Sequence, residues 1–101
     1  ACYAAGINDL VLDPGFGFGH KVEHNYHILR RLEHLQQFNV PVLAGVSRKS
    51  MIYKVLETTA EEALNGTTVL HTVALMKKAQ LLRVHDVKEA KECIRLLAQL
   101  H

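Results

Sequence analysis

Polar and cationic side chains that could bind an anionic ligand follow three apolar segments of the sequence. The three sets are Asp13 after residues 10–12, then Ser47, Arg48 and Lys49 after residues 40–46, and finally Arg83 and His85 after residues 81–82. Each apolar run belongs to a segment that the sequence predicts to be a buried strand. In α/β proteins, ligands bind just past the carboxyl ends of parallel strands. These residues therefore predict one site for an anionic, hydrogen-bonding ligand.

Each set suits a different part of such a ligand. An ionised Asp13 accepts two hydrogen bonds, as the edge of a heterocycle with adjacent N–H donors requires. Lys49 is a flexible point charge for a ring carbonyl, a ring nitrogen or a phosphate. Arg83 and His85 together would bind an anion. Arg48 is expected to hold its loop through a structural ion pair instead.

A glycine-rich turn follows Asp13 over residues 14–19, with the sequence Pro-Gly-Phe-Gly-Phe-Gly. Its glycines permit unusual backbone torsions and close approach of the backbone to a ligand. An ordinary loop between a strand and a helix would have the same composition. The stretch Ser47-Arg48-Lys49-Ser50 could likewise be a solvated turn, so for both segments the two interpretations stay open on composition alone.

Composition excludes several classes of protein. The chain has 101 residues, 49% of them hydrophobic, and a net charge of +2, which argues against a disordered chain and against nucleic-acid or membrane binding. Cys2 and Cys93 fit no metal or redox spacing and are expected to be free thiols in a reducing cytoplasm. His20, His24 and His27 are expected on a polar helix face rather than around a metal.

The order of elements is strand, helix, strand, helix, strand, helix. The strands are predicted over residues 9–13, 41–46 and 80–85, and the helices over 24–38, 60–78 and 87–99. Capping boxes are expected at Thr59 with Glu62 and at Asp86 with Glu89, and Gly66 is a possible break in the second helix. Continuous apolar strands joined by helices predict a parallel sheet.

Three parallel strands alone would leave two edges unpaired. The chain is therefore expected to be a segment of a larger barrel or sheet, or to complete itself by oligomerising. It begins at Ala1 without a methionine, which also suggests a segment.

Four stretches together resemble dihydropteroate synthase, and the resemblance covers essentially the whole chain. They are Leu12-Asp13-Pro14-Gly15-Phe16-Gly17-Phe18-Gly19, Gly45-Val46-Ser47-Arg48-Lys49-Ser50, Asn65-Gly66-Thr67-Thr68 and Leu82-Arg83-Val84-His85-Asp86-Val87. The resemblance implies an α/β fold: residues 1–101 would be the C-terminal segment, about three β/α units, of a pterin-binding TIM (β/α)8 barrel. It implies an enzyme that condenses a dihydropterin-methyl diphosphate with p-aminobenzoate in folate biosynthesis and that sulfonamides inhibit by competition.

The resemblance also assigns roles to residues. Asp13 would bind the pterin edge, Lys49 the pterin and the border of the aminobenzoate pocket, and Arg83 with His85 the departing diphosphate. Asp13, Lys49, Arg83 and His85 would be the catalytic residues, with Gly17, Phe18, Ser47 and Ser50 as further substrate contacts. No metal ligand is expected in this segment, because Mg²⁺ would be held by the missing N-terminal part.

Two positions depart from the family pattern. His20 stands where the family usually has lysine, although Lys21 follows, and Lys78 replaces a glycine usual before the last strand. The segment alone is expected to be inactive, and the full-length enzyme is expected to be a homodimer. The alternatives are a pterin-binding methyltransferase-type domain with a cobalamin partner, and a non-catalytic remnant that binds pterin or phosphate.

Overall fold

The computed structural model describes residues 2–3, 10–17 and 21–100. Its elements are β1 (Cys2–Tyr3), β2 (Leu10–Val11), α1 (Val22–Arg30), η1 (Leu32–Phe38), β3 (Leu43–Ala44), α2 (Ser50–Tyr53), η2 (Ala60–Glu62), α3 (Leu64–Met76), β4 (Leu81–Leu82) and α4 (Val87–Ala98). Within this part of the chain, no helix is long and apolar enough to cross a membrane.

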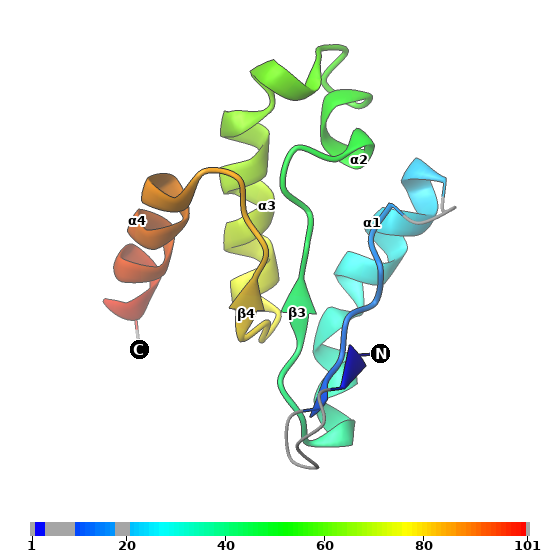
Figure 1. Ribbon diagram of the computed structural model, residues 1–101, viewed down its shortest axis with the longest axis vertical. Helices are drawn as coiled ribbons and strands as arrows, with labels where there is room; N and C mark the ends of the chain where they lie inside the picture. Colours follow the sequence, from blue (N-terminus) through cyan, green and yellow to red (C-terminus); the bar gives the residue numbers. More distant parts are fainter. Residues whose placement is uncertain (1, 4–9, 18–20, 101) are drawn as a thin grey trace.

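Three parallel segments form the centre of the molecule, in the order predicted. β3 pairs in parallel with β4, and Leu12, directly after β2, forms a parallel bridge with Val42. Figure 1 shows β3 and β4 side by side and pointing the same way. The regular strands are shorter than the sequence predicted. β1, which pairs antiparallel with β2, was not predicted.

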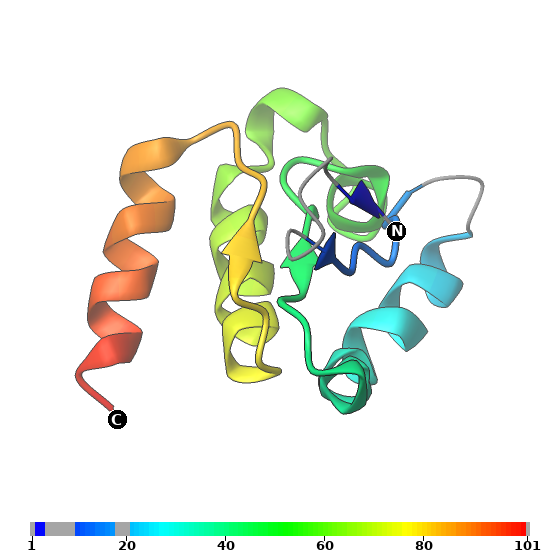
Figure 2. The same cartoon turned by 60° about the horizontal axis from the view of Figure 1, so that its bottom comes forward.

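Helices cover one face of these segments, and the described residues place no helix over the other. Figures 1 and 2 show α3 behind the strands. In Figure 1, α4 lies to the left of α3, and α1 lies to the right of β3. Strand periodicity matches this arrangement, because Val42, Ala44 and Val46 alternate and are each at most 1% exposed. Leu81 is 43% exposed and marks the open face, which a complete barrel would enclose.

The helices differ in detail from the sequence prediction. Residues 24–38 divide into α1 and η1, and the short helix α2 was missed. The second helix breaks at Ala63 rather than at Gly66, which lies inside α3. On α4 the buried side chains are Ala90 and Cys93, whereas Ile94 is 48% exposed.

Neither predicted capping box forms. Thr59 precedes η2 and Asp86 precedes α4, but neither side chain makes a capping hydrogen bond. At the C-terminal ends of helices, α2 and α3 are each followed by a Schellman motif. In these motifs Thr58 N–H donates to Tyr53 O, and Ala79 N–H donates to Ala74 O.

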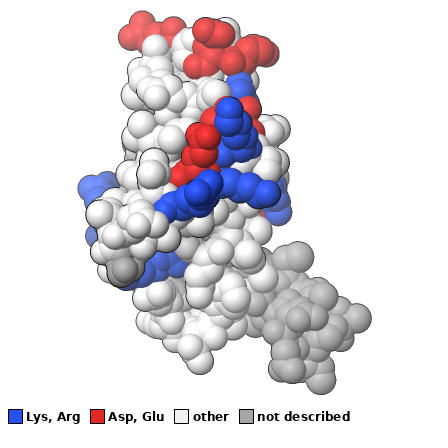
Figure 3. All heavy atoms as spheres, turned by 90° about the vertical axis from the view of Figure 1, so that its left-hand side faces the viewer, with Lys and Arg blue, Asp and Glu red and all other residues white. Residues whose placement is uncertain are grey.

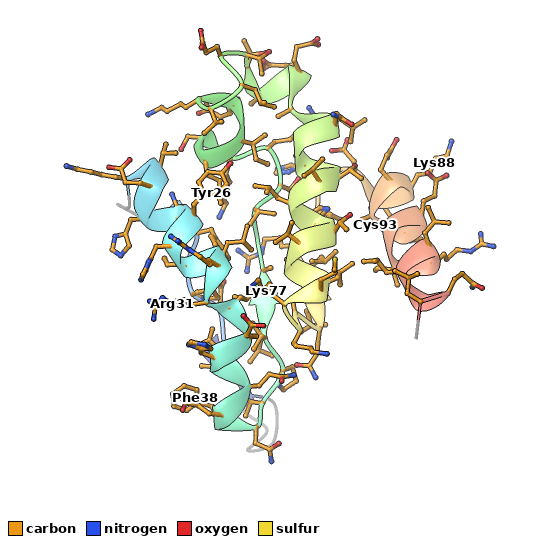
Figure 4. The ribbon with its side chains drawn as sticks, turned by 180° about the vertical axis from the view of Figure 1, so that it is seen from behind. Tyr26, Arg31, Phe38, Lys77, Lys88 and Cys93 are labelled. Atoms are coloured by element: carbon orange, nitrogen blue, oxygen red, sulfur yellow. The ribbon has the colours of Figure 1, made fainter. Side chains whose placement is uncertain are left out.

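Tertiary contacts join the helices at two places visible in Figure 4. Tyr26 of α1 donates its hydroxyl to Met51 O of α2 at 2.6 Å. Cys93 of α4 is a buried free thiol whose Sγ lies 3.1 Å from Thr72 Oγ1 of α3. The free-thiol prediction is therefore confirmed for Cys93, whereas the Cys2 side chain lies outside the described part.

Candidate functional site

The carboxyl ends of the three parallel segments bring Asp13, Lys49 and Arg83 together. Asp13 Oδ2 lies 3.7 Å from Arg83 Nη2. A Cβ atom on Gly45 would lie 3.8 Å from Lys49 Nζ and 3.7 Å from Arg83 Cβ. Gly45 therefore leaves room for a lysine and an arginine to share one side of the sheet. The convergence expected from three separated motifs is present.

Asp13 is held by the backbone that follows it. Its Oδ1 accepts the Gly15 N–H at 2.8 Å, and its side chain is 22% exposed. Gly15 has φ 73°, a left-handed conformation that glycine adopts without steric cost. A carboxylate has about four lone-pair positions, so Asp13 keeps acceptor capacity for a ligand.

The glycine-rich turn packs against the core through Phe16, which is 1% exposed. Gly17 follows with φ 87°, and its N–H donates to Asn25 Oδ1 at 2.9 Å. Phe16 O accepts a hydrogen bond from Lys49 Nζ. The turn therefore touches the lysine directly. Phe18, one of the predicted substrate contacts, lies outside the described residues.

Arg48 holds its loop through a structural ion pair, as predicted. Its Nε and Nη2 donate to the two oxygens of Asp86 at 2.9 and 3.0 Å, and its Nη1 donates to Ala60 O and Glu61 O at 2.8 Å each. This pairing explains why Asp86 does not cap α4. The hydrogen bond with Asp86 raises the pKa of Arg48 and lowers the pKa of Asp86.

The backbone at Arg48 is left-handed, with φ 52°. Its N–H donates to Thr67 Oγ1 at 3.0 Å, and Thr67 is 1% exposed. Such a conformation persists when surrounding contacts fix it, as the guanidinium bonds and Thr67 do here. The fixed backbone at Arg48 also positions its two neighbours. Ser47 contacts His85 after β4, and Lys49 contacts Phe16 after β2.

Lys49 is partly buried among these groups. Burial lowers the pKa of its ammonium; Asp13 opposes this effect and Arg83 adds to it. A lysine in this setting is a cation whose charge is only partly screened by water, so an anionic or polar ligand group placed beside it would be attracted strongly.

Ser47 connects the second strand end to the third. Its Oγ accepts the His85 backbone N–H at 3.2 Å and lies 2.8 Å from His85 Nδ1. Because Oγ accepts the hydrogen bond from the backbone N–H, its own hydroxyl can donate to Nδ1; in that tautomer Nε2–H is the outward donor. The Arg83 and His85 side chains both reach solvent.

An open pocket of about 330 Å³ lies beside Lys49. Its lining is Phe16, Gly17, Arg48, Lys49, Ser50, Tyr53 and Ala60. Ser50 and Gly17, two of the predicted substrate contacts, therefore line one cavity with the lysine. A larger hollow, about 400 Å³, lies between α3 and α4, and Asp13, Lys49 and Arg83 are not among the residues that line it.

The described residues contain no cluster of three or more His, Cys, Asp or Glu side chains that could hold a metal. The rings of His24 and His27 lie 6.5 Å apart on α1, and His20 is outside the described part. Asp13 faces the Arg83 guanidinium and Asp86 is paired with Arg48, so these two carboxylates are balanced by arginines and do not offer the set of oxygen ligands that Mg²⁺ prefers.

Sequence reasoning assigned no role to two polar residues of this region, Asn25 and Thr67. Both are buried, at 0% and 1% exposure, and each fixes a backbone N–H of a predicted motif. Asn25 carries a signal that the sequence does contain. It lies four residues before Leu29 and seven before Leu32, so it is a polar residue on the apolar face of a helix.

Comparisons with known proteins agree with this arrangement. The family described as pterin binding enzyme matches residues 1–85. The dihydropteroate synthase of Escherichia coli K12 is 47% identical over 98 residues, covering 95% of this chain and 35% of the relative. The Yersinia pestis enzyme with a pterine-sulfa conjugate superimposes with a TM-score of 0.90 at 42% identity, covering 92% of this chain and 37% of that chain.

A dihydropteroate synthase from Coxiella burnetii, in complex with pteroic acid, gives a TM-score of 0.82 at 37% identity over 87% of this chain and 33% of that chain. The fold and the converging strand ends define a segment of a β/α barrel, which confirms the predicted fold class. The chain belongs to the pterin binding enzyme family. It spans about a third of the length of the relatives that it matches.

Proposed function

We propose that the complete protein is a dihydropteroate synthase, and that residues 1–101 form the C-terminal part of its barrel. The reaction would join p-aminobenzoate to the methylene carbon of a dihydropterin-methyl diphosphate and release diphosphate, and sulfonamides would compete with p-aminobenzoate. The observation that carries the proposal is the meeting of Asp13, Lys49 and Arg83 at three adjacent strand ends. The likeness to synthases with 47% and 42% identity supports it.

Asp13 would bind the N–H edge of the pterin ring. Its carboxylate is oriented by the Gly15 N–H and is only 22% exposed, so water would screen its negative charge only partly. As diphosphate leaves, positive charge develops at the pterin methylene carbon, and a fixed carboxylate stabilises that charge.

Arg83 and His85 would bind the diphosphate. The Arg83 side chain is 62% exposed and can turn toward a ligand, and His85 presents Nε2 because Ser47 occupies the Nδ1 side. Charge-assisted hydrogen bonds of this kind stabilise a leaving group as its charge grows. Ser47 would contribute by orienting the imidazole.

Lys49 would lie between the two halves of the substrate. Its Nζ contacts Phe16 O, and its neighbours in the 330 Å³ pocket include Gly17 and Ser50. We propose that this pocket borders the p-aminobenzoate position, with Phe18 on the same side. A lysine at that boundary can donate to the pterin and attract the aminobenzoate carboxylate.

Three further properties belong to the complete protein. Mg²⁺ would be bound by residues outside this segment, and we derive no step through it. A cytoplasmic location is compatible with the buried free thiol of Cys93. A homodimer is supported by exposed apolar side chains on the outer helices and just after α4, such as Met76, Leu96 and Leu100 at 62, 71 and 73% exposure. Figure 3 shows broad uncharged areas on the side where α4 lies.

The proposal is tested in a chimera in which this chain replaces the corresponding segment of the Escherichia coli enzyme. We expect the folded chimera to form dihydropteroate, and Lys49→Ala or Arg83→Ala to reduce kcat/KM by about a hundredfold. Arg95→Ala, which removes an exposed cation of α4, is the matched control and should leave turnover unchanged. A chimera with native-like circular dichroism and no turnover would contradict the proposal, as would an unaffected Lys49→Ala variant.

A further inference from the structure

Asn25 is a buried amide for which the proposed chemistry gives no role. It lies in the first turns of α1, is 0% exposed, and shares a helix face with the core residues Leu29 and Leu32. A buried amide destabilises a fold unless its groups are hydrogen-bonded. Its Nδ2 has no hydrogen-bond partner among the residues that the structure describes. A leucine would fit this apolar face without that cost, so packing alone does not account for an asparagine here.

One peptide group of the glycine-rich turn joins Asn25 to Lys49. The N–H of Gly17 donates to Asn25 Oδ1 at 2.9 Å. The carbonyl of the same peptide unit, Phe16 O, accepts the hydrogen bond from Lys49 Nζ. This peptide plane is therefore held from both sides, by the asparagine at its N–H and by the lysine at its C=O.

The positive φ of Gly17 is compatible with two orientations of this peptide. A φ of 87° is the value that the third residue of a type II turn takes, and the peptide before that residue reverses when such a turn converts to type I. Reversal would carry Phe16 O away from Lys49. A hydrogen bond to Asn25 Oδ1 exists in only one of the two orientations, so Asn25 selects the orientation in which the carbonyl faces the lysine.

We propose that Asn25 is a positioning residue that fixes the Lys49 ammonium at the ligand site by orienting the Phe16–Gly17 peptide. The inference rests on the proposed function for its kinetic consequence, but the coupling between Asn25 and Lys49 is a property of the fold alone. Close packing strengthens this coupling, because a Cβ on Gly17 would lie 3.1 Å from Lys49 Cδ.

The test compares Asn25→Leu and Asn25→Asp in the chimera, with Leu29→Met as a control on the same helix face. Leucine keeps the branched shape of the side chain, with somewhat more bulk, and removes the acceptor, whereas aspartate keeps an acceptor oxygen. We expect Asn25→Leu to lower kcat by about tenfold or more while the KM for p-aminobenzoate changes less, since misplaced catalytic groups cost rate. Asn25→Asp, which keeps the acceptor oxygen, should have a kcat within about threefold of the parent.

A second readout does not depend on turnover. Acetylation of Lys49 by acetic anhydride, measured by mass spectrometry relative to the exposed Lys91, should rise in Asn25→Leu and not in Leu29→Met. If Asn25→Leu does not fold, Asn25→Ser replaces it, because its shorter side chain no longer reaches Gly17. A folded variant with unchanged kcat and unchanged Lys49 labelling would overturn the inference. An inactive parent chimera would instead contradict the proposed function, and the labelling comparison would still test Asn25.

Discussion

Gly66 tests how closely α2 and α3 pack behind the site. It lies inside α3, where an alanine would ordinarily stabilise the helix. A Cβ at this position, however, would lie 2.5 Å from Ile52 Cγ2 and 3.1 Å from Leu56 Cδ1. Ile52 is 2% exposed and belongs to the core, so it has little room to move. Gly66→Ala is therefore predicted to destabilise the protein.

The magnitude follows from two opposing effects. Replacing glycine by alanine inside a helix contributes about 1 kcal/mol of stability. Overpacking a core costs about 1–3 kcal/mol, and a 2.5 Å separation belongs in the upper part of that range. The expected net loss in the free energy of unfolding is about 1–2 kcal/mol.

Urea denaturation followed by circular dichroism measures this loss in Gly66→Ala, Ile52→Leu and the double variant. Ile52→Leu removes the Cγ2 methyl with little change in volume and should cost about 1 kcal/mol alone. In the double variant the clash is relieved, so the two losses should fall short of additivity by about 1 kcal/mol. A stabilised Gly66→Ala variant, with additive behaviour in the double variant, would refute the reasoning.

Three further predictions concern the backbone, pH and a helix contact. Lys78 ends α3 in a Schellman motif with φ 79°, so Lys78→Gly should raise thermal stability by about 0.5–1 kcal/mol, whereas Lys78→Ala should give no gain in the same melting experiment. Burial lowers the pKa of His71, which is 2% exposed, although Asp86 opposes this shift. Below about pH 6.5 His71 becomes protonated in the unfolded chain but stays neutral in the folded chain, so the stability should fall as the pH falls. In His71→Leu the urea midpoint should depend less on pH in this range. Tyr26→Phe leaves Met51 O without its donor and should cost about 1 kcal/mol, measured by urea denaturation; a variant as stable as the parent would mean that water replaces the hydroxyl.

The strand ends were predictable because their signal is local. An apolar run followed by a charged or hydroxyl group identifies each end, and parallel connectivity then places the ends at one edge. Asp13, Lys49 and Arg83 meet for this reason. The position of Lys78 was also visible, because the family resemblance expects glycine where the structure has a left-handed residue.

What the sequence did not reveal depends on contacts between distant segments. Asp86 has the sequence context of a helix cap, but Arg48, 38 positions earlier, binds both of its oxygens. A charge-assisted, two-point ion pair outcompetes a local capping bond. Gly66 was read as a possible break, whereas the approach of Ile52 from α2, a helix the sequence did not predict, explains it.

The central claim is that three strand ends form one site, with the pterin bound at Asp13 and the diphosphate at Arg83. Isothermal titration of the chimera with pteroic acid and with the dihydropterin-methyl diphosphate tests it directly. We predict that Arg83→Ala weakens binding of the diphosphate compound alone, whereas Asp13→Asn weakens binding of both compounds. Unchanged affinity for both ligands in both folded variants would contradict the account.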